Sequence, residues 1–212
     1  SWEKLTRILT HEIMNSLAPV TSISHTLLSS SGDAETMRQG LETIHATSDR
    51  LLRFVDSFRA VTRIPAPQKA PFYLSELVAE SLSLIPHDVI GVEVCIVPTD
   101  TMLYAARTLM SQVFVNLLKN ATEALFMQDC NRKITIRSTI DAEERIQIEI
   151  TNNGSAIPAE VAENIFTPFF TTKTDGSGIG LAVSRQIIRL HGGSLRHKHN
   201  EAGRVTFAVV VE

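Results

Sequence analysis

Residues 176–181 read Gly-Ser-Gly-Ile-Gly-Leu and lead directly into a helix-like segment that runs to residue 190. Alternate glycines let a backbone approach a polyphosphate closely, and a helix N-terminus presents free N–H groups to it. The stretch is not a Walker loop, because no Gly-Lys-Ser/Thr follows. It is not a Rossmann loop either, because its spacing is Gly-x-Gly-x-Gly and residues 171–175 are not strand-like. Alone such a loop is weak evidence, so the segments around it decide the fold.

Three further polar stretches precede this loop. Asn116 and Asn120 stand one turn apart on a helix predicted over residues 108–126. Side-chain amides can coordinate Mg²⁺ through oxygen and donate to phosphate through nitrogen. Residues 151–158 form a polar turn after a predicted strand, and residues 165–173 cluster aromatics beside hydroxyls and a lysine. Taken singly, each has an ordinary explanation: helix-surface amides, a turn, and a hydrophobic loop anchor.

The N-terminal third predicts two long amphipathic helices. Apolar residues recur every three or four positions over residues 5–27 and again over residues 37–58. Two helices with one apolar stripe each cannot enclose a core alone. We therefore expect a second copy to complete a dimeric four-helix bundle, with packing on the rest of the chain as the alternative.

A proline-rich segment divides the chain. Residues 64–71 hold three prolines, which end the helical part and place the domains at 1–66 and 67–212. The second part mixes helix-like segments with strand-like alternation, and residues 133–138 and 145–151 suggest adjacent antiparallel strands. The predicted fold class is α+β, with an α/β sandwich and a mixed sheet after the helical hairpin.

One histidine lies on the polar side of the first predicted helix. On a helical wheel His11 faces away from the apolar stripe, Asn15 follows one turn later, and Glu12 adjoins it. A neutral imidazole near pH 7 offers a nucleophilic nitrogen, and a neighbouring carboxylate can fix its tautomer and accept a proton. A solvated surface position is the simpler explanation for a lone histidine, and His25 and His45 keep it.

The order of these pieces resembles the sensor histidine kinases of two-component systems. Residues 11–20, His-Glu-Ile-Met-Asn-Ser-Leu-Ala-Pro-Val, resemble their phosphoacceptor box, closest to the nitrogen-regulation type. The four polar stretches resemble, in order, the nucleotide-binding boxes of their ATP-binding domain, of the GHKL or Bergerat type. Residues 191–195 and 203–207 resemble its trailing segments, so the resemblance covers essentially the whole chain.

The resemblance implies a protein-histidine kinase core that works as a homodimer. It would autophosphorylate His11 from Mg-ATP and pass the phosphoryl group to an Asp in the receiver domain of a response regulator, with regulator phosphatase activity as a further role. Glu12 would act as base or tautomer-fixing partner, and Asn15 would position water for regulator dephosphorylation. Asn120 would coordinate Mg²⁺, and Asn116 would contact the phosphates or ribose.

The resemblance also implies a mobile lid over ATP at residues 157–176. Thr171, Thr172 and Lys173 would stand at its phosphate-facing end, and the glycines would wrap the polyphosphate. Besides Asn116 and Asn120, the nucleotide-binding residues that the resemblance implies are Asn152, Gly154, Ile157, Phe170, Thr171, Thr172, Lys173, Gly176, Gly178, Ile179, Gly180, Leu181 and Thr206.

Several positions depart from the family pattern. Asn152 stands where the family has an Asp that accepts from the adenine amino group, and Ala156 replaces a glycine. A neutral amide is the weaker acceptor, so we expect ATP affinity to be lower by about 5- to 30-fold, or roughly 1–2 kcal/mol. Ala106 cannot cap the helix that follows, so either its start is shifted or Thr108 caps it.

Two alternatives stay open beside the kinase. An ATPase of the gyrase kind would place a catalytic Glu where this chain has Asn116. A catalytically weak or inactive histidine-kinase-like scaffold or phosphatase is the other, since Met14 and Ser16 replace the family's usual basic residue and proline, and Asn152 and Ala156 are atypical as well.

Composition excludes other classes. The net charge of −3 gives no electrostatic reason to expect nucleic-acid binding, and two cysteines do not make a disulfide scaffold. No apolar run is as long as a membrane span, so we expect no membrane contact by this segment and a cytoplasmic location, with an anchor elsewhere in the parent protein left open.

Overall fold

The computed structural model describes residues 2–29, 33–86, 90–126, 131–173 and 176–211. The chain divides into two compact units, Ser1–Arg63 and Ile64–Glu212. The first is a helical hairpin and the second combines helices with a sheet. Among the described residues, no helix is both long and apolar enough to cross a membrane.

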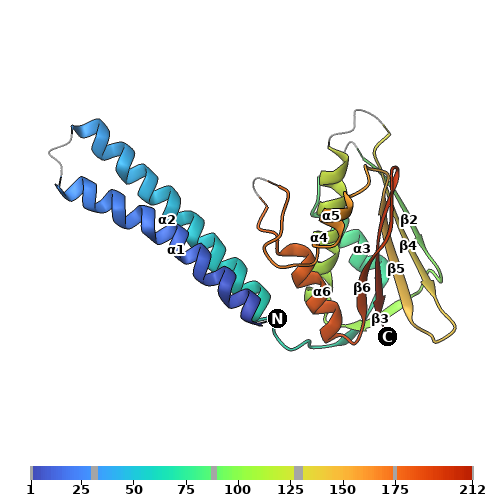
Figure 1. Ribbon diagram of the computed structural model, residues 1–212. Helices are drawn as coiled ribbons and strands as arrows, with labels where there is room; N and C mark the ends of the chain where they lie inside the picture. Colours follow the sequence, from blue (N-terminus) through green and yellow to red (C-terminus); the bar gives the residue numbers. More distant parts are fainter. Residues whose placement is uncertain (1, 30–32, 87–89, 127–130, 174–175, 212) are drawn as a thin grey trace. The chain divides into compact units, whose positions relative to one another are not determined.

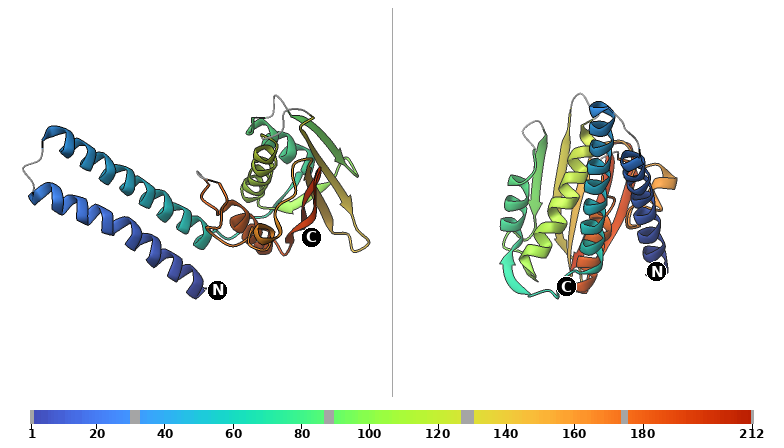
Figure 2. Two further views of the ribbon diagram at one scale, coloured as in Figure 1. Left: turned by 45° about the horizontal axis from the view of Figure 1, so that its top comes forward. Right: turned by 90° about the vertical axis from the view of Figure 1, so that its left-hand side faces the viewer.

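The hairpin consists of α1 (Trp2–Ser29) and α2 (Ala34–Thr62), which lie side by side (Figures 1 and 2). α1 runs through Pro19 without ending. The Asp33 carboxylate caps α2 by accepting from the Thr36 N–H at 2.8 Å, and this bond lowers the pKa of Asp33. Gly40 allows close helix contact, because a Cβ there would lie 2.8 Å from the Leu27 side chain.

One hairpin does not bury its own apolar residues. Met14 is 59% exposed and Leu28 is 86% exposed, whereas Ser16 and Thr47 are buried. The other large apolar side chains that stay exposed on the two helices are Leu17, Met37, Leu41 and Leu52. The hairpin therefore presents apolar surface that it does not cover by itself.

The second unit is built on a five-stranded mixed sheet. The strand order is β2-β4-β5-β7-β6, with β2 and β4 parallel and the other neighbours antiparallel. The strands of this sheet are β2 (Gly91–Ile96), β4 (Lys133–Ile140), β5 (Ile146–Asn152), β6 (Ser194–Glu201) and β7 (Arg204–Val211). A separate antiparallel pair is formed by β1 (Ala70–Tyr73) and β3 (Met102–Ala105).

Helices cover one face of the sheet and leave the other open (Figures 1 and 2). The helices are α3 (Leu74–Ser83), α4 (Arg107–Leu125), the short α5 (Ala159–Ala162) and α6 (Gly180–Leu190). Every second residue of β5 is buried, from Ile146 to Asn152, as expected of a strand with one covered face. The core lies between this face and α4, whose Phe114 is fully buried.

The structure confirms the α+β class and the mixed sheet. The predicted neighbours 133–138 and 145–151 pair antiparallel, with Ile136 opposite Ile150. Strand β6 was not predicted, because Ser-Leu-Arg-His-Lys-His-Asn-Glu is largely polar. It lies at the edge of the sheet, where polar residues are tolerated.

Candidate functional site

Asn116 joins two helices. Its Nδ2 donates to the Gly180 carbonyl and to the Ser184 hydroxyl, each at 3.3 Å. α4 is thereby tied to the first turn of α6, the helix that follows the glycine-rich loop. α6 begins without a side-chain cap, so its first backbone N–H groups are not occupied by a capping side chain.

Asn120 lies one turn further along α4 and contacts the ammonium group of Lys173. Its Oδ1 accepts from the Lys173 ammonium at 3.1 Å, and the same ammonium pairs with the Glu123 carboxylate. Amide and carboxylate oxygens are ligands that suit Mg²⁺. No cluster of three or more His, Cys, Asp or Glu suited to a metal occurs in the described residues. The donor set therefore fits Mg²⁺ that takes its other ligands from phosphates and water.

Asn152 ends β5 and is 3% exposed. Its Oδ1 accepts from the Gly154 backbone N–H at 3.0 Å. A Cβ on Gly154 would lie 2.8 Å from that oxygen and 3.0 Å from the Ala124 carbonyl oxygen. The turn after β5 thus requires glycine at this position, and it fixes the Asn152 amide.

Thr206 does not join Asn152. Thr206 pairs with Thr151 across β5 and β7, and their hydroxyls lie 2.9 Å apart, whereas Asn152 pairs with Val205. Successive residues of a strand point to opposite faces. The Thr206 side chain therefore leaves the sheet on the face opposite to Asn152.

The predicted lid is held at its first residue. Asn200 accepts from the Ile157 N–H and donates to the Ile157 carbonyl, both at 2.7 Å. Further along, Phe166 packs edge-on against Phe207, and the Arg185 guanidinium lies 4.8 Å from the Phe166 ring centre. These contacts anchor the segment to β6, β7 and α6.

The C-terminal part of the lid turns at a glycine. Gly178 has a φ of +65°, and its carbonyl accepts from the Phe169 N–H at 2.9 Å. A Cβ on Gly178 would lie 2.6 Å from the Phe169 carbonyl carbon and 2.7 Å from the Phe170 carbonyl oxygen. The residues named for the phosphate-facing end, Thr171, Thr172 and Lys173, are exposed.

His11 faces solvent on α1, with 71% of its side chain exposed. The Asn15 amide lies 3.1 Å from its Nδ1, and the Glu12 carboxylate lies 3.7 Å from the same atom. Within the described part of the chain, both polar neighbours approach Nδ1. Because the Asn15 amide nitrogen can only donate, Nδ1 accepts in this arrangement, and the ring proton of the neutral form lies on Nε2.

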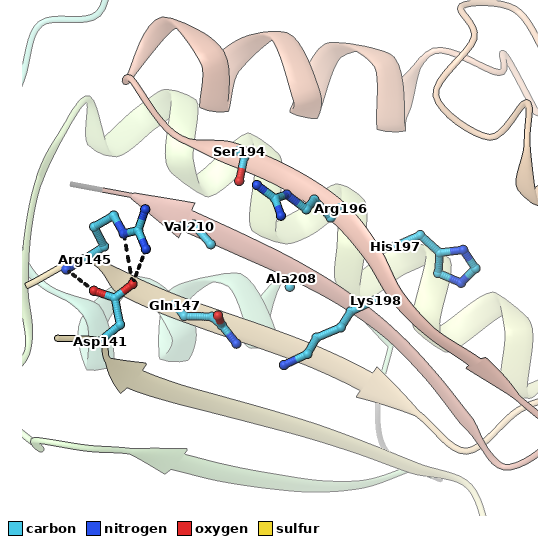
Figure 3. Close-up of a pocket in the computed structure, with 9 residues that line it drawn as sticks. All are labelled: Asp141, Arg145, Gln147, Ser194, Arg196, His197, Lys198, Ala208 and Val210. Carbon is cyan, nitrogen blue, oxygen red and sulfur yellow. Dashed lines mark hydrogen bonds and ion pairs between the residues drawn. The ribbon is translucent and has the colours of Figure 1, made fainter. Parts of the chain in front are cut away.

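A hollow of about 280 Å³ lies elsewhere, along β5, β6 and β7 (Figure 3). None of the predicted site residues lines it. Arg145 is paired with Asp141 at 2.8 Å, and Lys198 is paired with Glu149. Arg145 and Lys198 are thus already paired with carboxylates of the same unit, and the candidate site stays with the residues of α4, α6 and the lid.

Sequence reasoning missed three residues of this region. Glu123 holds the lid lysine, Asn200 holds the start of the lid, and His191 bonds the residue before α4. Glu123 follows Asn120 by one helical turn, a spacing that could have indicated it. The partners of Asn200 and His191 lie 43 and 85 residues away, and no local pattern marks them.

Comparison with known proteins agrees with this geometry. Residues 105–212 match the histidine kinase-, DNA gyrase B-, and HSP90-like ATPase family. "Sensor protein FixL" of Bradyrhizobium diazoefficiens is 30% identical over 208 residues, which cover 94% of this chain and 41% of FixL. "Nitrogen regulation protein NtrY" of Azorhizobium caulinodans is 30% identical over 216 residues, which cover 96% of this chain and 28% of NtrY.

A solved relative extends the match to both units. The structure of histidine kinase ThkA in complex with response regulator protein TrrA is 29% identical, with a TM-score of 0.66, and covers 98% of this chain and 60% of that one. The chain thus spans less than half of the two curated relatives. It belongs to the histidine kinase-, DNA gyrase B- and HSP90-like ATPase family, and these relatives confirm the predicted resemblance to sensor histidine kinases.

Proposed function

We propose that this chain is the core of a sensor histidine kinase that transfers the γ-phosphoryl group of Mg-ATP to His11 and then to an aspartate of a response regulator. The observation that carries the proposal is the exposed cluster of His11, Glu12 and Asn15, in one chain with a nucleotide-binding fold of this family. The solved complex of ThkA with its response regulator supports the class of partner.

Attack by Nε2 would use both polar neighbours of His11. For Nε2 to be the nucleophile, the neutral ring must carry its proton on Nδ1. Glu12, at 3.7 Å from Nδ1, can accept that proton as the N–P bond forms and the bond to the β-phosphate oxygen breaks. The Asn15 amide nitrogen lies 3.1 Å from the same atom and can only donate, so the amide would turn over and accept from the Nδ1 proton through Oδ1 in order to orient the ring. It would later hold a water for regulator dephosphorylation.

The second unit would hold the nucleotide between α4, α6 and the lid. Asn152 would face the base, and the N-terminus of α6 with Gly178 would face the phosphates. Asn120 would bind Mg²⁺, which when bound neutralises phosphate charge. Lys173 would move to the phosphates when Mg-ATP binds. Mg²⁺ would take its place on Asn120, and the phosphates would offer its ammonium group a new anionic partner in place of Glu123.

The exposed apolar surface of the hairpin supports a homodimer. Leu17, Leu41 and Leu52 are each more than 40% exposed, although they lie on helices with one apolar side. A second hairpin would bury them in a four-helix bundle. Phosphoryl transfer would require a nucleotide unit to reach a His11, either that of its own protomer or that of the partner.

The test is incubation with γ-labelled ATP and Mg²⁺. We expect acid-labile label that disappears in His11→Gln and persists in His25→Gln, which changes another exposed histidine of α1. Transfer of the label to a receiver domain completes the test. A folded dimer that binds ATP but takes up no label would contradict kinase activity and favour the scaffold or phosphatase alternative.

A further inference from the structure

The orientation of the Asn152 amide is fixed by its surroundings. A backbone N–H can only donate, so the Gly154 N–H requires the oxygen of the amide, and Oδ1 accepts it at 3.0 Å. The Nδ2 group must then point the other way. Turning the amide over would set two donors against each other at a buried site, since Asn152 is 3% exposed.

The Nδ2 group of Asn152 keeps its hydrogens available to a ligand. Within the described residues, Nδ2 of Asn152 donates to no side chain or carbonyl. It is not one of the described polar atoms that are both sealed from solvent and unpartnered, which are Thr122 Oγ1 and His197 Nε2. An N–H donor therefore stands at the C-terminal end of β5, where a carboxylate would present only acceptors.

This difference changes which purines fit. A carboxylate accepts from a 6-amino group and repels a 6-oxo group, because acceptor would face acceptor. The Asn152 amide can donate from Nδ2 to a 6-oxo group without turning. A 6-amino group has to use the second lone pair of Oδ1, which already accepts from Gly154.

Resting on the nucleotide site proposed above, we infer that Asn152 opens the base pocket to 6-oxopurine nucleoside triphosphates, which bind at least as tightly as ATP. The position is rigid enough to impose such a choice. Asn152 is paired in register with Ile134 on one side and Val205 on the other, and its Oδ1 is held by the Gly154 N–H.

The test compares inosine triphosphate and ATP by titration calorimetry with Mg²⁺ on the whole chain. These two ligands differ at the purine 6-position and in the protonation of the adjacent ring nitrogen, with the ribose and phosphates unchanged. We expect inosine triphosphate to bind at least as tightly as ATP. In Asn152→Asp, the preference should move toward ATP by about tenfold or more.

The matched control is Asn131→Asp. Asn131 is exposed, has a φ of 54° that aspartate also tolerates, and contributes only its carbonyl to Asn153. Asn131→Asp adds the same charge as Asn152→Asp and should leave the ratio of the inosine triphosphate and ATP affinities unchanged. A measurable wild-type preference for ATP over inosine triphosphate would overturn the inference, even if Asn152→Asp does not fold. Failure of ATP itself to bind would instead overturn the proposed function.

Discussion

The Nε2 atom of His191 accepts a hydrogen bond from the Ala106 N–H at 3.0 Å, across 85 residues of sequence. The other ring nitrogen lies 2.8 Å from the Ile187 carbonyl, to which it donates. The buried ring is thus neutral, with its proton on Nδ1. It ties the end of α6 to the residue before α4, which begins at Arg107 without a side-chain cap from Thr108 or Ala106.

We expect His191→Phe to destabilise the second unit by about 1–3 kcal/mol, because the buried Ala106 N–H loses its acceptor. Urea unfolding followed by circular dichroism measures this. His199→Phe is the control, since the ring of His199 bonds the exposed Arg204 side chain, and a cost within about 0.5 kcal/mol is expected there. Equal costs for the two variants would contradict a structural role for the His191 bond.

Alanine substitutions at two glycines with similar φ angles can separate the cost of backbone strain from the cost of a steric clash. Gly178 has a φ of 65° and Gly203 a φ of 80°, but a Cβ on Gly203 would meet nothing within 4 Å. We expect Gly203→Ala to cost about 1 kcal/mol from backbone strain alone. Gly178→Ala should cost more and also weaken ATP binding, because its Cβ meets the lid backbone. Calorimetric titration showing equal ATP affinity in both variants would count against the lid assignment.

Local periodicity predicted what depends on neighbouring residues. It gave both hairpin helices, α4, α6 and the β4–β5 pair, because burial of one face imposes a period of 3.6 or 2. It missed β6, whose polar residues suit an edge position. It did not separate Thr206 from Asn152 either, since the strand register decides which face each side chain takes.

The site was predictable in outline and not in its contacts. Asn116 bonds the first turn of α6, and Gly154, which follows Asn152, lies against the end of α4 at Ala124. The spacing could not show that Gly154 occupies the Asn152 oxygen or that Lys173 lies on Asn120. Those contacts depend on how loops close in three dimensions.

The proposed move of Lys173 from Asn120 and Glu123 to the phosphates predicts a salt-dependent effect on ATP binding. Lys173→Met should weaken ATP by about two- to fivefold, the equivalent of a partly exposed ion pair, and the loss should shrink as salt rises. Lys119→Met is the matched control, because Lys119 lies 3.9 Å from the same Glu123 carboxylate without contacting Asn120. Titrations at low and high salt in which both variants lose affinity equally would exclude a specific role for Lys173.

His197 predicts how stability depends on pH. Burial lowers the pKa of His197 below its ordinary value of 6.5, and its ring stacks on Phe207 with centroids 5.1 Å apart. The unfolded chain therefore takes up a proton at a higher pH than the folded one. The buried, neutral His197 ring therefore contributes its full share to the free energy of unfolding above pH 6.5. This share is lost as the pH falls through 6.5, where the unfolded chain takes up the proton, and toward the lower pKa of the folded state.

The measurement is the free energy of unfolding in urea at about pH 7.5 and about pH 5.5. His197→Phe keeps an aromatic ring against Phe207 and removes the titrating group, so its stability should fall less between the two pH values than that of the wild type. His199→Gln, two residues along the same strand, should keep the wild-type difference. If His197→Phe loses as much stability as the wild type on acidification, other groups carry the pH dependence.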